Sequence, residues 1–174
     1  MDPRYPIGKF EWKGGLTAEQ RQRSIAEIEK TPAEFRAAIG RLSPQQLDTP
    51  YRPGGWTVRQ LAHHVPDSHM HSYLRFKLAL TEEQPAISAY DEKVWAELPD
   101  SRETPVETSL ALLEALHHRW VVLLRSMKTA DFARAYRHPE RGPVSLDMAV
   151  AMYAWHGRHH TAHVTALSER MGWK

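Results

Sequence analysis

The sequence predicts an all-α fold, a four-helix bundle with long connecting loops. Four segments of about 20 residues or more combine helix-start signals with apolar side chains at i, i+3 and i+4 spacing. No stretch of alternating polar and apolar residues bounded by turn signals indicates a strand, beyond a short irregular piece. With 174 residues and a mass of 20.0 kDa, the chain is expected to form one domain, residues 1–174, that can hold a polar site inside its core.

The first helix is preceded by an arm. Residues 1–16 contain two prolines and a Gly-Gly pair and are expected to be extended. A capping box, Thr17-Ala18-Glu19-Gln20, begins the helix. A second cap with a proline at the next position, Thr31-Pro32, predicts an interruption, after which the helix continues over residues 35–42.

Each of the other three long helices is expected to begin at a Ser or Thr cap. The second runs from Thr57 to about Leu80, and the third from Thr104 to about Met127. The fourth runs from Ser145 to the residues just before Gly172, which is expected to end it at about Met171. The predicted loops, rich in proline and polar residues, are residues 43–55, 82–101 and 129–143.

Composition excludes several classes of function. The absence of cysteine excludes disulfides, thiolate nucleophiles and cysteine zinc motifs, so histidine and carboxylate are the remaining metal ligands. A net charge of +2 does not indicate a surface that binds nucleic acid. No window approaches the roughly 18 apolar residues of a membrane span, and the N-terminus lacks the apolar stretch of a signal peptide. We expect a soluble, cytoplasmic protein with no nucleic-acid or membrane partner.

The run WHGRHHTAH at residues 155–163 is the strongest motif. On a helix, His156 and His160 stand one turn apart on one face, at a spacing suited to chelation. His160 falls near the middle of the apolar stripe of this helix and His156 on its flank, whereas His159 and His163 lie farther away. A lone core histidine is more often a hydrogen-bonded structural residue, but a buried i, i+4 pair with a second histidine-rich helix favours metal binding.

A third ligand is expected from the second helix, which carries four histidines. His63 points away from the apolar stripe, whereas periodicity permits both His64 and His69, and His71 is a further candidate. An interior proline, Pro66, predicts a bend beside the site. On the last helix Gly157 replaces the glutamate of the H-E-x-x-H motif, so a zincin protease is not expected. His117 and His118 on the third helix are expected to be exposed.

The sequence resembles the DinB-like superfamily of metal-binding four-helix bundles, and in particular its YfiT-like branch. The resemblance rests on WTVRQLAHH at residues 56–64 and WHGRHHTAH at residues 155–163, supported by shorter matches along nearly the whole chain. It implies that the metal ligands are His64, His156 and His160, and so favours His64 over His69 as the third ligand. Pro66 stands where the family pattern has alanine. The resemblance further implies a cytoplasmic homodimeric enzyme, described as a metal-dependent hydrolase or, in some members, as a bacillithiol S-transferase.

Three neutral imidazoles would leave one coordination position of a divalent ion free for chemistry. Zinc suits this set best, and nickel would also bind, with one ion expected per chain. The first hypothesis is an enzyme that activates a low-molecular-weight thiol for S-transfer to a small electrophilic substrate.

Two alternatives stay open. The first is metal-dependent hydrolysis of an amide-like or ester-like bond by metal-bound water, with Asp67, His159 or His163 as the nearest candidates for a general base. The second is a stress protein that binds metal or ligand without turnover, for which His69 would supply a closing fourth ligand. The sequence identifies no catalytic residue beyond the ligands.

Overall fold

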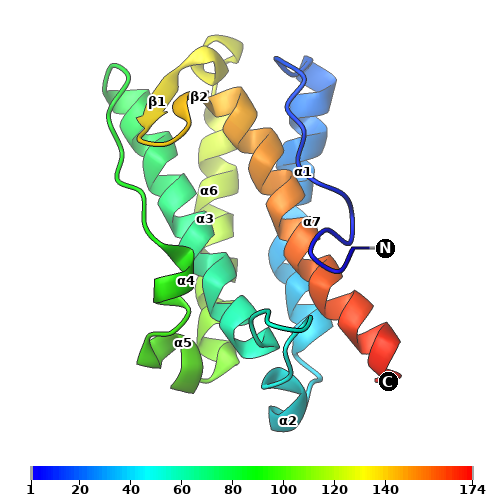
Figure 1. Ribbon diagram of the computed structural model, residues 1–174. Coiled ribbons are helices and arrows are strands. Elements are labelled where there is room, and N and C mark those ends of the chain that lie inside the picture. Colours follow the sequence, from blue (N-terminus) through cyan, green and yellow to red (C-terminus); the bar gives the residue numbers. More distant parts are fainter. Residues whose placement is uncertain (1, 174) are drawn as a thin grey trace.

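A computed structural model describes residues 2–173 and has four long helices (Figure 1). They are α1 (Ala18–Ile39), α3 (Val58–Thr81), α6 (Val106–Ser126) and α7 (Leu146–Met171). Helix α7 packs against α1 and α3, and α6 packs against the same two helices on the other side. The prediction of an all-α four-helix bundle is confirmed. No helix of the described residues is long and apolar enough to cross a membrane.

Most of the predicted helix ends are found in the structure. Thr17 and Thr57 form complete capping boxes with Gln20 and Gln60, and the Ser145 hydroxyl accepts a hydrogen bond at the start of α7. Gly172 ends α7 with φ of 66°, a left-handed conformation that glycine adopts without steric cost. These ends are local in origin, which explains why the sequence predicts them.

The predicted interruption at Thr31-Pro32 is wrong, because α1 continues through it. Thr31 does not cap a helix; its hydroxyl donates to the carbonyl of Glu27 at 2.9 Å inside α1. Pro32 has no backbone N–H, so the carbonyl of Ile28, four residues earlier, receives no hydrogen bond from that position. Helix α3 likewise continues past Pro66.

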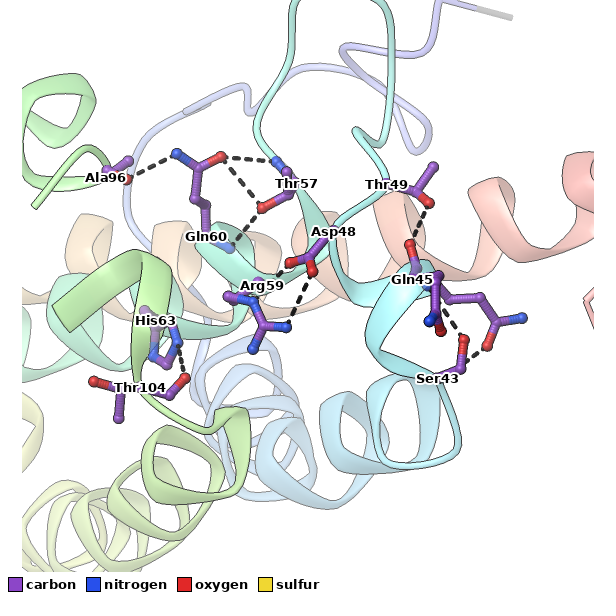
Figure 2. A network of polar contacts seen from close by, with 11 residues as sticks. Ser43, Gln45, Asp48, Thr49, Thr57, Arg59, Gln60, His63, Ala96 and Thr104 are labelled. Carbon is purple, nitrogen blue, oxygen red and sulfur yellow. Dashed lines mark hydrogen bonds and ion pairs between the residues drawn. The ribbon is translucent and has the colours of Figure 1, made fainter. Parts of the chain in front are cut away.

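The predicted cap at Thr104 is also wrong. Helix α6 begins at Val106, with Pro105 in the cap position and no side-chain hydrogen bond there. Thr104 instead ends the short helix α5 (Pro99–Glu103), and its carbonyl accepts a hydrogen bond from His63 Nε2 at 3.1 Å (Figure 2). The tertiary contact with α3 therefore decides the local structure here.

The predicted loops contain short elements. Helix α2 (Pro44–Leu47) lies in the first loop, and α4 (Glu92–Trp95) and most of α5 lie in the second. The third contains a 3₁₀ turn, η1 (Thr129–Ala133), and an antiparallel hairpin of β1 (Ala135–His138) and β2 (Gly142–Ser145). Where only a short irregular piece of strand was expected, the structure has a regular antiparallel hairpin; Tyr136 pairs with Val144 in it, and both are buried against the bundle.

The bundle core is divided into two apolar clusters. One cluster contains Ile28, Trp120 and Tyr153, and the other contains Phe35, Leu113, Val164 and their neighbours. Buried polar side chains lie between these stretches on α3 and α7, among them His69 and His160, and the buried His117 of α6 contacts His69. The fold therefore places a polar layer across the bundle between two hydrophobic ends.

Candidate metal centre

Three histidines from two helices converge in the polar layer. His64 on α3 and His156 and His160 on α7 each offer a ring nitrogen, and the three nitrogens lie within 4.8 Å of one another. The ring of His64 is 5.5 Å from that of His156 and 5.0 Å from that of His160, measured between centroids. Trp56 packs on the His64 ring at 4.7 Å and limits its movement. The i, i+4 spacing on α7 and the packing of α3 against α7 thus produce the cluster.

The geometry fits a small divalent cation. Nε2 of His156 lies 3.2 Å from Nε2 of His160. Two imidazole ligands of a tetrahedral ion, with bonds of about 2.0–2.1 Å, place their nitrogens about 3.4 Å apart. The pair therefore already stands at almost the separation that chelation requires.

The ring charges also suit a cation. Burial lowers the pKa of His64 to about 4 and lowers the pKa values of His156 and His160 well below their usual range, with neighbouring histidines adding to the effect. All three rings are therefore neutral near pH 7, the state in which imidazole binds a metal. His160 is buried, whereas His64 and His156 are partly exposed, so one side of the cluster reaches solvent.

A second group of histidines shares His160. Ring nitrogens of His159, His160 and His163 also lie within 4.8 Å of one another. This group would use consecutive turns of α7 alone, whereas the first group joins α3 to α7. Both groups consist of histidine alone among residues 2–173, and neither includes a carboxylate.

Two of the histidines on α3 lie outside the cluster. The Nε2 of His63 donates to the carbonyl of Thr104, next to α5 (Figure 2). His63 Nδ1 is 2.7 Å from the Ser109 hydroxyl, so this buried ring also contacts α6. His71 stacks on Tyr90 with 4.4 Å between ring centroids and holds the second loop against α3. Both are structural contacts.

His69, which periodicity permitted as a ligand, is fully buried with both nitrogens occupied. Its Nε2 lies 3.0 Å from His156 Nδ1, and its Nδ1 lies 2.8 Å from His117 Nε2. His69 therefore stands behind the cluster and does not close a four-ligand site. It has no place in either group of possible ligands.

His117 is buried, although it was expected to be exposed. It is only 1% exposed, while its neighbour His118 is exposed as expected. The sequence carried the signal, since His117 falls at helical spacing between Leu113 and Trp120, both buried. Its Nδ1 lies 2.6 Å from the carbonyl of Ile28, the acceptor that Pro32 leaves free.

His159 and His163 are more buried than helical periodicity suggests, with 7% and 3% exposed. The N-terminal arm covers their side of α7, where it runs beside the helix (Figure 1). The Arg4 carbonyl lies 3.2 Å from His163 Nε2, and the Gly8 carbonyl accepts from Trp155 Nε1 at 3.3 Å. Local periodicity could not reveal this cover, because Arg4 and His163 are 159 positions apart in the chain.

The third candidate base, Asp67, is half-buried on α3. Burial, with a smaller contribution from the charge of Asp100, raises the pKa of Asp67 to about 6. A carboxyl with such a pKa can exchange a proton near neutral pH. It is not among the groups that could hold a metal ion.

Comparison with known proteins agrees with the fold. The chain matches the DinB superfamily over residues 27–164. It is 56% identical over 172 residues, 99% of each protein, to proteins of Bacillus mycoides and Bacillus cereus, each named "Putative metal-dependent hydrolase". YfiT from Bacillus subtilis, described as "a probable metal-dependent hydrolase with an unusual four-helix bundle topology", superposes with a TM-score of 0.97 at 48% identity, covering 100% of both chains. A further four-helix bundle protein, with a TM-score of 0.61 at 18% identity over 84% of this chain and 98% of its own, shares the fold. The chain belongs to the DinB superfamily.

Proposed function

We propose that this protein is a metal-dependent enzyme whose divalent cation is held by His64, His156 and His160. The observation that carries the proposal is the convergence of three neutral imidazole nitrogens within 4.8 Å of one another. A set of three histidines is typical of catalytic zinc sites, in which a fourth position stays open. Because both nitrogens of His69 have other partners, this residue does not support a closed, non-catalytic site.

A cation in this position would lower the pKa of a bound water or thiol and so supply a nucleophile at neutral pH. The protein's own contribution is orientation: Trp56 packs on His64, and contacts behind the cluster hold His156 and His160. The partly exposed rings of His64 and His156 leave a side by which a small substrate can approach. Zinc is the proposed metal because it accepts three imidazoles in a tetrahedral arrangement, and nickel is the competing ion.

Hydrolysis is the reaction class that we place first, on an amide-like or ester-like bond of a small molecule. The support comes from relatives that cover 99% of the chain and are named as metal-dependent hydrolases. Asp67 is the carboxyl in α3 whose raised pKa suits proton transfer. Of the two histidine candidates, His159 is preferred because its buried Nδ1 has no hydrogen-bond partner among residues 2–173, whereas both nitrogens of His163 have partners. The sequence alone placed thiol transfer first; we place hydrolysis first because the relatives named above are described as metal-dependent hydrolases.

Transfer of a low-molecular-weight thiol is the second candidate. The observation that favours it is the absence of a carboxylate from both histidine groups among residues 2–173. A thiol of pKa about 8.5 becomes a nucleophile once a cation stabilises its thiolate, and needs no carboxylate base. Hydrolysis of an amide requires a further group to protonate the departing amine.

The test begins with protein made without a histidine tag and analysed for its metal content. We expect close to one zinc or nickel ion per chain in the wild type and almost none in His160→Ala. The exposed His118→Ala variant is the matched control and should retain the metal. The zinc-loaded protein is then assayed with chromogenic esters and amides, and with a panel of thiols and a chromogenic electrophile. Full metal content in His160→Ala would contradict the proposed site.

The family resemblance also leads us to propose a homodimer. Leu112 and Val122, apolar side chains on α6, are 43% and 64% exposed in the single chain and are available for contact with a partner. Light scattering after size-exclusion chromatography should give twice the mass of 20.0 kDa. A mass of one chain at all concentrations would contradict this.

A further inference from the structure

Two rows of hydrogen-bonded histidines lead away from the cluster, and each ends on a backbone carbonyl. The long relay runs from His156 through His69 to His117, with nitrogen to nitrogen distances of 3.0 and 2.8 Å, and reaches the Ile28 carbonyl at 2.6 Å. It contacts all four long helices, since these residues belong to α7, α3, α6 and α1.

The short relay leads in the other direction. His160 Nδ1 lies 3.3 Å from His163 Nδ1, and His163 Nε2 lies 3.2 Å from the Arg4 carbonyl in the arm. One relay therefore begins at each of the two α7 histidines of the cluster, always from the nitrogen Nδ1 that faces away from it.

The carbonyl at the end of the long relay determines the direction of every hydrogen bond in it. A carbonyl oxygen only accepts, so His117 must carry its hydrogen on Nδ1. A neutral imidazole has one N–H, which makes His117 Nε2 an acceptor for the Nδ1–H of His69. By the same step, His69 Nε2 accepts from the Nδ1–H of His156. Burial lowers the pKa of His117 to about 4, in agreement with a neutral ring.

The short relay has the same consequence for His160. Its terminal carbonyl requires the hydrogen of His163 on Nε2, so His163 Nδ1 accepts from the Nδ1–H of His160. His156 and His160 are then both without hydrogen on Nε2, although these two atoms are 3.2 Å apart. Two lone pairs facing each other at this distance repel unless a cation lies between them.

We propose that His69, His117 and His163 are positioning residues, which fix the tautomers of His156 and His160 so that both Nε2 lone pairs point into the metal site. This inference rests on the proposed function. Outer hydrogen-bond partners of this kind set the ring orientation and tautomer of ligating histidines. Both relays end on a backbone carbonyl, so they fix the tautomers before a cation binds. The long relay uses the Ile28 carbonyl that Pro32 leaves without a hydrogen bond.

The relays also indicate which of the two histidine groups would bind the metal. In the group of His159, His160 and His163, the nitrogens by which His160 and His163 approach each other are their Nδ1 atoms, 3.3 Å apart. In the proposed tautomers one of these atoms carries a hydrogen, so it cannot bind a metal. The relays therefore direct the cation to the group that contains His64.

The tautomers can be measured without any metal. Long-range ¹H–¹⁵N correlation spectra of metal-free protein labelled in its histidine rings distinguish Nδ1–H from Nε2–H. We expect the Nδ1–H form, the less favoured one for histidine in water, for His69, His117, His156 and His160. His163 should show the Nε2–H form. An Nε2–H form of His156 or His160 would overturn the proposal.

Zinc affinity, measured by competition with a chelator, tests the positioning role. His69→Leu removes the acceptor for His156 and should weaken zinc binding about 10- to 100-fold. His69→Gln keeps an acceptor oxygen and should restore most of the affinity, which a purely structural role would not predict. His118→Leu on the exposed face of α6 is the control. Unchanged affinity in a folded His69→Leu protein would overturn the role of the long relay.

A second pair of variants covers the case in which His69→Leu does not fold. His163→Leu, beside the arm, should weaken zinc binding in the same way and His163→Gln should restore it. Unchanged affinity in His163→Leu would overturn the role of the short relay. His64→Leu should abolish binding, whereas His159→Leu should leave it nearly unchanged. The opposite result for His64 and His159 would assign the metal to the other group and overturn the proposal.

The two proposals can fail separately. Wild-type protein that binds zinc but shows other tautomers would overturn the relays and leave the proposed function intact. Wild-type protein that shows the expected tautomers but binds no divalent metal would overturn the proposed function, and the positioning role with it.

Discussion

His117 shows how a single buried histidine links stability to pH. Burial lowers its pKa from 6.5 to about 4, and its Nδ1 is hydrogen-bonded to Ile28. Between these two pH values the unfolded chain takes up a proton that the folded protein does not. Stability is therefore complete above pH 6.5 and falls as the pH is lowered toward 4.

For the metal-free protein, we expect the contribution of this residue to fall by about 2 kcal/mol between pH 7 and pH 5. Urea unfolding of the wild type and of His117→Asn at both pH values measures it. The variant should lose less stability on acidification than the wild type, by about that amount. His118→Asn, altered at an exposed neighbour, should lose as much as the wild type. Equal losses in wild type and His117→Asn would contradict the prediction.

Asp67 should have the opposite dependence on pH. Because burial and Asp100 raise its pKa from 3.8 to about 6, the folded protein holds the proton more tightly than the unfolded chain does. The protonated carboxyl therefore favours the folded state at low pH, and this contribution to stability is lost as the pH rises through about 6. Asp67→Asn should therefore be more stable than wild type at pH 8 and equal to it near pH 3.5, by chemical denaturation.

The same variant tests the proposed reaction. If Asp67 transfers a proton during hydrolysis, Asp67→Asn loses activity although it gains stability at pH 8. Asp100→Asn serves as a control, because it removes the neighbouring charge and keeps the Asp67 carboxyl. Full hydrolytic activity in Asp67→Asn would remove this residue from the mechanism and leave His159 as the candidate.

At the scale of elements, Gly157 explains the close approach of α1 and α7. A side chain at this position would place its Cβ 2.5 Å from Thr31 Oγ1 and 2.6 Å from Thr31 Cγ2. The sequence suggested only that Gly157 replaces a catalytic glutamate. The structure adds a reason for glycine, since any larger residue would push apart the helices next to His156.

Gly157→Ala is accordingly expected to destabilise the protein. Alanine improves helix propensity by up to about 1 kcal/mol, but overpacking at a close contact costs about 1–3 kcal/mol. The net loss should appear as a lower midpoint of thermal unfolding. Thr31→Ala removes the two nearest atoms and should recover part of the stability in the double variant. A double variant no more stable than Gly157→Ala would show that the strain lies elsewhere.

The proline inside α1 shows where local signals mislead. Thr31-Pro32 has the composition of a helix start, yet α1 continues through it. Packing against α6 and α7 compensates for the missing hydrogen bond, and His117 donates to the freed carbonyl. Thr57 and Ser145 act as the caps that the sequence predicts, because their hydroxyls accept hydrogen bonds from the backbone N–H groups of Gln60 and Met148.

For the whole molecule, the polar layer separates two apolar clusters that must unfold together if residues 1–174 form one domain, as we propose. The long relay contacts all four long helices in this layer. The proposed metal site joins α3 to α7 at the same level. We therefore expect one cooperative unfolding transition, which metal binding should move to higher temperature.

Zinc at 100 times its dissociation constant should stabilise the protein by about 2.7 kcal/mol. For a protein of this size that corresponds to about 5–10 °C in the unfolding midpoint. Scanning calorimetry with and without zinc measures the shift, and His160→Ala should show none. Two separate transitions would contradict the single domain, and an equal shift in His160→Ala would contradict the proposed ligands.

The sequence by itself determined the features that depend on local chemistry. Caps, helical periodicity and a terminal glycine predict the long helices, and i, i+4 spacing predicts that His156 and His160 share a face. Composition limited the possible ligands. The resemblance to a family selected His64, which periodicity alone could not separate from His69.

The tertiary structure alone decided which histidines face each other across helices. The contact of His117 with the Ile28 carbonyl, the occupied nitrogens of His69 and the cover of His163 by the arm all depend on contacts between residues far apart in the chain. Periodicity describes one helix at a time, so it cannot tell which neighbour a side chain will meet. A hydrogen-bond direction set by a carbonyl on another element becomes visible only when all four helices are packed.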